Sequence, residues 1–142
     1  MKITSKGRYG LMAMVYLATN YNSERFFKSR EIADSQNIPL KYLEHIINSL
    51  KKNNLVNSLR GSEGGHRLAK APDKITVYDI LLSLEGNLSI IDGDGSDFFK
   101  DNSHSGIFWD NINNQIKTIL EIPLSVFIAN MLESESGYMY FI

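Results

Sequence analysis

The sequence predicts a mainly α-helical protein that carries one small β-hairpin. Three observations support this fold class. Apolar residues recur at helical spacing in the first 85 residues, two short extended runs flank a glycine-rich turn at residues 61–65, and a second amphipathic stretch follows a polar segment. With 142 residues, 43% of them hydrophobic and 22% charged, the chain is long enough for one domain with a core plus a helical arm.

The first 52 residues contain three predicted helices. Residues 5–20 are apolar around most of the helix circumference, so this helix must be covered on two sides. Ser29 is the expected N-cap of a short helix that runs through Gln36. Pro39 suits the first turn of a third helix. The expected buried stripe of the third helix follows the i, i+3, i+4, i+7 rule and consists of Leu43, Ile46, Ile47 and Leu50.

A hairpin and a fourth helix follow. The extended runs on either side of residues 61–65 predict two antiparallel strands joined by a tight turn. Pro72 ends the second run, and Thr76 and Asp79 have the spacing of a capping box that opens the next helix. The predicted order through residue 85 is therefore helix, helix, helix, hairpin, helix.

The remainder of the chain is expected to form a linker and a dimerisation region. Residues 86–106, rich in Gly, Asp, Ser and Asn, predict a flexible linker between a head of residues 1–85 and an arm of residues 107–142. In the arm, a stripe at the a/d spacing of a coiled coil predicts self-pairing, although the same stripe could be ordinary core. This dimer seam consists of Trp109, Ile112, Ile116 and Ile119. A last short helix, about 124–132, precedes an apolar tail.

Charge is divided unequally along the chain. Residues 1–70 hold twelve Lys and Arg against five Asp and Glu, a net +7, whereas residues 71–142 hold three against eleven, a net −8. A basic head of this kind is suited to a polyanion. Combined with the order of helices and hairpin, the charge predicts a winged helix-turn-helix head, with the third helix in the major groove of DNA and the basic wing at the minor groove.

A competing interpretation is a protein-binding adaptor that keeps the winged fold without reading DNA. Glu63 at the hairpin tip favours it, because a negative charge there would repel phosphate. Salt dependence discriminates between the two, since phosphate contacts make affinity fall steeply with salt concentration.

Several other function classes are excluded by missing residue types. The chain has no cysteine, which excludes disulfides, thiol nucleophiles, cysteine-ligated zinc and iron–sulfur clusters. It carries no phosphate-loop lysine and no hydrolase or zinc-protease motif, so we expect no enzyme activity. Asp92, Asp94 and Ser96 imitate a calcium loop, but Asp97 and Ser103 replace its glycine and glutamate. We therefore expect neither a metal nor a cofactor.

The apolar run at residues 11–18 follows Lys2, Lys6 and Arg8 and imitates a signal peptide. No cleavage site follows it, and the run is far shorter than the ~20 residues needed to span a bilayer. We therefore expect a cytoplasmic protein without a membrane partner.

The sequence resembles the Rrf2 family of bacterial winged-helix transcription regulators over nearly the whole chain. Three segments carry this resemblance. They are residues 1–10, Tyr42-Leu43-Glu44, and the hairpin from Leu55 to Leu68 with its Arg60-Gly61 and Gly64-Gly65 pairs. Ser62 and Glu63 depart from the family's commoner Pro-Gly wing tip. Iron–sulfur members place three cysteines in the stretch that here runs from Asp92 to His104. Because this chain has none, sensing through that cluster is excluded.

The resemblance implies a homodimer, paired through long C-terminal helices, on double-stranded DNA with a palindromic operator. It also implies recognition residues at the start of the third helix and a wing arginine in the minor groove. Carried onto this chain, the DNA-reading residues are Lys41, Tyr42, Glu44, His45 and Arg60, and the phosphate contacts are Ser5, Lys6, Tyr9 and Ser29.

Within this family, both ends of the chain are similar to the regulators that repress cysteine metabolism. Those relatives take their signal from cysteine synthase, which the resemblance therefore implies as a partner. The expected contacts are Tyr138, Met139 and Ile142, because capture of a terminal carboxylate with an aliphatic side chain is a known peptide-binding mode. Packing of this apolar tail on the protein's own body is the alternative interpretation.

Overall fold

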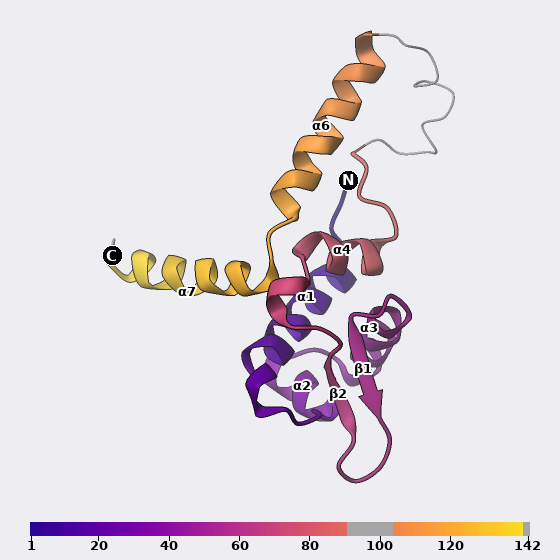
Figure 1. Cartoon of the computed structure of the whole chain (residues 1–142), viewed down its shortest axis with the longest axis vertical. Helices are drawn as coiled ribbons and strands as arrows, with labels where there is room; N and C mark the ends of the chain where they lie inside the picture. The colour runs from indigo at the N-terminus through magenta and orange to yellow at the C-terminus, as the bar shows by residue number, and fades with distance from the viewer. Residues whose placement is uncertain (91–103, 141–142) are drawn as a thin grey trace.

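The computed structural model describes residues 1–90 and 104–140, and it confirms a mainly helical protein with one hairpin (Figure 1). A head holds the first four helices and the hairpin, and two further helices leave it in different directions. The helices are α1 (Ser5–Thr19), α2 (Ser29–Gln36), α3 (Leu40–Lys52), α4 (Val77–Glu85), α6 (His104–Leu120) and α7 (Leu124–Tyr140), the strands are β1 (Val56–Leu59) and β2 (Gly65–Leu68), and short 3-10 helices span Tyr21–Ser23 and Pro72–Lys74.

Helix α1 lies at the centre of the head and is covered on two sides, as its apolar circumference predicted. Its Met14 and Leu17 are buried in the main core with α2 and α3. Leu11 packs against a second cluster formed by Val77 and Leu81 of α4. The two helices approach closely at Gly10, where a Cβ would collide with a leucine side chain of α4. The apolar surface of α1 is thus buried from both directions.

Two local predictions about the helices are confirmed. The stripe on α3 is buried throughout. The capping box at α4 is complete: the Thr76 N–H donates to Asp79 Oδ2 over 3.0 Å, and the Asp79 N–H donates to Thr76 Oγ1 over 3.0 Å. Both features depend only on residues within about two turns of one another, which is why the sequence reveals them.

The hairpin is a wing tied to the segment before α2. Strands β1 and β2 pair antiparallel, with Val56 opposite Leu68 and Leu59 opposite Gly65. Phe27 adds one bridge to β2, since its N–H and carbonyl exchange hydrogen bonds of 2.8 Å with His66. Gly65 has a φ of +143°, and a Cβ there would collide with the Phe27 backbone. The wing therefore has a defined position relative to α2.

Helix α7 begins inside the head. Leu124 is fully buried in the main core, and its N–H donates to the Ile75 carbonyl over 2.7 Å. The Val77 N–H donates to the Ile122 carbonyl over 3.0 Å, which holds the turn between α6 and α7 against the start of α4. From this anchor, α6 and α7 extend away from the head (Figure 1). No described helix is both long and apolar enough to cross a membrane.

Four predicted helix boundaries are wrong. Helix α6 begins at His104, inside the segment predicted as a linker, instead of at residue 107. The last helix continues to Tyr140 instead of ending near residue 132, because no proline follows Pro123 and Met131, Leu132 and Glu133 favour helix. Ser29 is the first residue of α2 and not its N-cap. Lys28 occupies that position, because the Glu31 carboxylate accepts the Lys28 N–H over 2.8 Å. Pro39 likewise precedes α3 instead of lying in its first turn.

Candidate nucleic-acid interface

Helix α3 presents a polar face opposite its buried stripe. Lys41, Glu44 and His45 are exposed on this face, near the start of the helix. Tyr42 is half-buried, with its ring edge-on to Tyr9 of α1 at a centroid distance of 5.7 Å. The ammonium, carboxylate and imidazole groups can therefore reach base edges, whereas the Tyr42 ring is held against the head.

The wing presents Arg60 directly after β1, where its side chain is exposed. The turn that follows is tight: Gly61 has a φ of +108°, and a Cβ at Gly64 would collide with the Leu59 carbonyl. Lys28 Nζ donates to the Gly61 carbonyl over 2.8 Å. This bond fixes the wing beside the start of α2, so Arg60 projects from a supported turn.

The residue before α1 is bound to the end of α4 by a contact that the sequence does not predict. The Glu85 carboxylate accepts the Thr4 N–H over 2.8 Å and the Thr4 hydroxyl over 2.9 Å. Ser5 is exposed and accepts from Arg8 Nη2 over 3.3 Å, whereas Lys6 and Tyr9 are half-buried. Glu85 thus occupies both donors of Thr4, the residue that precedes the first turn of α1.

The start of α2 carries a second feature that the sequence does not predict. Ser29 Oγ lies 2.8 Å from His66 Nε2, and Ser58 Oγ of β1 lies 2.6 Å from His66 Nδ1. Burial lowers the pKa of His66, the Lys51 ammonium lowers it further, and Glu44 partly opposes them. The sequence shows only that a polar residue, His66, lies in a predicted strand. That observation does not identify Ser29, 37 positions away, as its partner.

The cations near α2 fall into two groups. Arg25 donates to Glu31 Oε1 over 2.8 Å, which holds the pKa of that carboxyl below its usual value, and lies 4.2 Å from the centre of the Phe27 ring. Arg67 donates to the Glu24 carbonyl over 3.3 Å. These two arginines, Arg25 exposed and Arg67 half-buried, have partners within the head that hold the segment before α2 in place.

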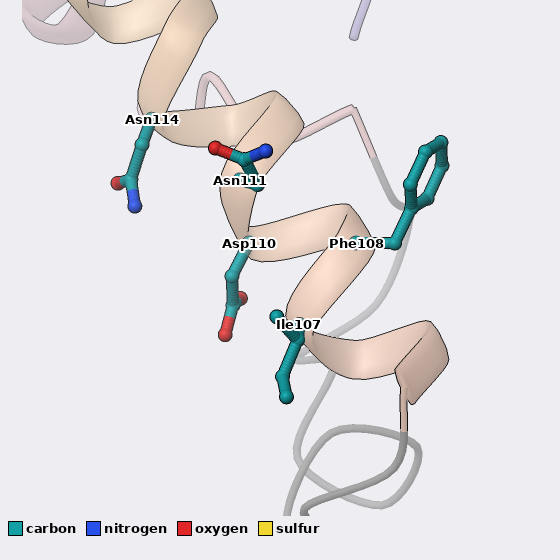
Figure 2. Close-up of a pocket in the computed structure, with 5 residues that line it drawn as sticks. All are labelled: Ile107, Phe108, Asp110, Asn111 and Asn114. Atoms are coloured by element: carbon teal, nitrogen blue, oxygen red, sulfur yellow. The ribbon is translucent and has the colours of Figure 1, made fainter.

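Helix α6 exposes a large apolar surface in a single copy of the chain. In the predicted seam, Ile119 is 73% exposed and Trp109 38%, whereas Ile112 and Ile116 are half-buried. Ile107, 62% exposed, lies with Asp110 and Asn114 along one side of a shallow hollow, and Phe108 points the other way (Figure 2). Exposed apolar surface of this extent is typical of a protein interface.

Several predicted residues lie at or beyond the described part of the chain. Tyr138 and Met139 fall on the last turn of α7, and Ile142 is outside the described residues. The imitation calcium loop with Asp92, Asp94 and Ser96 is also outside them. Among the residues that are described, no group of three or more His, Asp and Glu is placed to hold a metal ion.

A family model described as Rrf2, "Iron-dependent Transcriptional regulator", matches residues 3–130. The chain belongs to the Rrf2 family. It is 33% identical to the HTH-type transcriptional regulator CymR of Bacillus subtilis (strain 168) over 144 residues, covering 100% of both chains. This Rrf2 protein is therefore a DNA-binding transcription regulator, consistent with the polar face of α3 and the basic wing.

Solved structures show the same winged-helix fold. The structure of CymR (YrzC), titled the global cysteine regulator of B. subtilis, superposes with a TM-score of 0.76 and 32% identity, covering 92% of this chain and 98% of that one. T. potens IscR gives a TM-score of 0.74 and 34% identity, covering 99% and 96%. The predicted winged helix-turn-helix is thus confirmed.

The family description mentions iron, but this Rrf2 chain offers no thiolate ligand for it. The sequence contains no cysteine at any position. Since iron–sulfur clusters in proteins are held mainly by cysteine thiolates, a cysteine-ligated cluster does not fit these residues.

Proposed function

We propose that this Rrf2 protein is a sequence-specific repressor that acts as a homodimer on a palindromic operator. The observation that carries the proposal is the placement of Lys41 and His45 on the exposed face of α3, with Arg60 on the wing that packs beside this helix. A helix and a supported basic hairpin on one head suit simultaneous contact with the major and minor grooves.

Each predicted residue has a role that follows from its chemistry. Lys41 and His45 donate to guanine or adenine acceptors, and the Glu44 carboxylate accepts from a cytosine amino group. Arg60 enters a narrow minor groove, where the negative potential is strongest. Tyr42 contributes its hydroxyl from a ring held by Tyr9. The phosphate contacts, which set register and orientation, are Ser5, Lys6, Tyr9 and Ser29.

Dimerisation through α6 would allow the two heads to bind the two half-sites of a palindromic operator. One small head covers few base pairs, and two heads related by a twofold axis read two half-sites about one helical turn apart. The exposed apolar residues on α6 supply a self-complementary surface for such an axis.

Similarity to a protein titled the global cysteine regulator supports genes of cysteine or sulfur metabolism as targets. We further propose cysteine synthase as the partner that delivers the signal, on the resemblance of both ends of the chain to regulators that repress cysteine metabolism, with Tyr138, Met139 and Ile142 as contacts. With no thiolate in the chain, the signal is proposed to reach the protein without a cysteine-ligated cluster or other cofactor.

Selection of genomic fragments with the purified full-length protein tests this proposal. We expect enrichment of one palindromic motif upstream of cysteine or sulfur genes, and an affinity that falls steeply with salt concentration. Arg60→Ala should weaken binding and reduce the slope of log affinity against log salt by about one. Lys74→Ala removes an exposed charge outside the interface and serves as the matched control.

Two outcomes would contradict the proposal. A fragment pool recovered without any common motif would exclude sequence-specific reading. Binding that is absent or insensitive to salt would favour the protein-binding adaptor, which the exposed Glu63 at the wing tip suits.

A further inference from the structure

His66 connects two elements of the DNA-binding head through its side chain. Its ring lies between the hydroxyl of Ser29, the first residue of α2, and that of Ser58 on β1, at 2.8 and 2.6 Å. The His66 backbone is fixed by two hydrogen bonds of 2.8 Å to Phe27. The position of the imidazole is therefore fixed in the head, where its two nitrogens each contact a serine hydroxyl.

The protonation state of this imidazole decides how many serine O–H groups are free. A neutral ring has one N–H donor and one acceptor nitrogen. One serine then accepts from the N–H and keeps its own O–H free, while the other gives its O–H to the ring. A protonated ring donates from both nitrogens, so both serines accept and both O–H groups can donate elsewhere.

We propose that His66 is a positioning residue that aims the Ser29 and Ser58 hydroxyls at the DNA backbone, and that DNA binding draws a proton onto His66. Phosphate oxygens accept hydrogen bonds and carry negative charge, so they favour the state with two free O–H donors and a cationic ring. The proposal rests on the proposed phosphate contact of Ser29. It assigns to His66 a role that acts through the two serines.

Charged side chains lie near the His66 imidazole on each element that packs against it. Lys51 and Glu44 face it from α3 with opposite effects. Lys28, next to Ser29, directs its ammonium to the Gly61 carbonyl over 2.8 Å, and Arg67 on β2 is held by the Glu24 carbonyl. Burial and Lys51 keep the pKa of His66 below its ordinary value in the free protein. We therefore expect the imidazole of the free protein to be mainly neutral at pH 7.

The affinity for DNA should therefore increase as pH falls. The gain begins as pH falls through the pKa of His66 in the complex and levels off below its pKa in the free protein. Uptake of one proton limits the gain to about tenfold per pH unit for each protomer.

Nuclear magnetic resonance of the imidazoles tests the proton uptake directly. The chain has three histidines, at positions 45, 66 and 104, so single His→Gln variants assign their signals. With the full-length protein, we expect the pKa of His66 to lie below the ordinary value of a histidine without DNA and to rise in the complex with the selected operator duplex. An unchanged or lower pKa in the complex would overturn the proposal.

Affinity measured from pH 5.5 to 8 tests the role of the serines. His66→Gln keeps an amide donor and acceptor but does not titrate, so we expect near wild-type affinity at pH 8 and loss of the His66-dependent gain at pH 6. Ser29→Ala should weaken binding by a larger factor at pH 6 than at pH 8. His45→Gln is the control: it lowers affinity through the major groove but leaves the His66-dependent gain in place.

The outcomes separate this inference from the proposed function. Failure of the wild-type protein to select any operator would contradict the proposed function itself. If the wild-type protein binds an operator and the affinity of the His66→Gln variant changes with pH in the same way as that of the wild type, only the role of His66 is overturned. If His66→Gln lowers the melting temperature at pH 8, Ser29→Ala decides, because it keeps the histidine and its backbone pairing; equal losses at both pH values would then contradict the proposal.

Discussion

Neighbouring residues at the start of α3 differ in their exposure. Lys41, Glu44 and His45 are exposed, whereas the Tyr42 ring packs edge-on against Tyr9. Side chains at the start of a recognition helix contact base edges. Sequence preference should therefore depend on the exposed residues, and Tyr42 should also affect how α3 is placed against α1.

Replacing Lys41 or His45 with Ala should relax discrimination at particular base pairs of the operator. Each variant should lose about 1–3 kcal/mol of preference at one position of each half-site, because a donor to the base edge is removed. Binding to a panel of single-base operator variants measures this. Lys52→Ala, an exposed charge at the far end of α3, is the control and should lower affinity equally for all operators. Unaltered preference in both α3 variants would place the DNA-reading surface elsewhere.

At the scale of elements, α6 and α7 differ in how they relate to the head. Helix α6 contacts α4 only lightly and leaves Ile107 and Ile119 more than half exposed. Helix α7 begins at the fully buried Leu124. We therefore expect α6 to contribute to association between copies and the start of α7 to contribute to the stability of each head.

Replacing both Ile112 and Ile116 with Asp should convert the proposed dimer into monomers. Each carboxylate would be buried without a partner in the paired helices, at a cost of several kcal/mol. Sedimentation velocity measures the change. Asn111→Asp with Asn114→Asp adds the same two charges at exposed positions of α6 outside the seam and should remain dimeric. A double isoleucine variant that still sediments as a dimer would exclude this seam.

Leu124→Ala should lower the free energy of unfolding by about 2–5 kcal/mol, because it leaves a cavity in the core of the head. Leu132→Ala makes the same change on the same helix at a residue that is 60% exposed, and should cost less than about 0.5 kcal/mol. Both variants are made in the Ile112→Asp, Ile116→Asp protein, which we expect to be monomeric. Urea denaturation there measures core packing without a contribution from dimer dissociation. Equal losses would contradict the anchoring of α7 in the head.

Over the whole molecule, charge and apolar surface are separated along the chain. Residues 1–70, with their net +7, form most of the head and hold the predicted DNA-reading residues, whereas the acidic residues 71–142 include the exposed apolar residues of α6. Phosphates repel an acidic surface, so the second half is suited to protein partners. The proposed signal from cysteine synthase would therefore enter at the end of the chain away from DNA.

Deleting Ile142 should abolish binding of cysteine synthase and leave dimerisation and melting temperature nearly unchanged. The deletion removes the last aliphatic side chain and moves the terminal carboxylate, which are the two groups that this mode of peptide capture uses. Calorimetry with purified cysteine synthase compares the truncated and full-length chains. Equal affinity, or no binding by the full-length chain, would contradict the partner. A large fall in melting temperature would show that the tail packs on the protein.

Features that depend on near neighbours were predictable from the sequence. The buried stripe of α3, the turn at residues 61–65 and the Thr76–Asp79 box are confirmed, because helical spacing, glycine and capping act within a few residues. The end of α7 was not predicted, since the apolar residues after Leu132 are compatible with either a tail or a helix.

The sequence by itself determined the winged-helix head, its basic character and the amphipathic arm, since periodicity and charge are properties of the local sequence. Only the tertiary structure decided which distant side chains meet. Glu85 binds Thr4 across 81 positions, His66 binds Ser29 across 37, and Leu124 enters the core of the head. These contacts depend on how helices and wing pack together, and packing brings together groups whose separation in the chain carries no local signal.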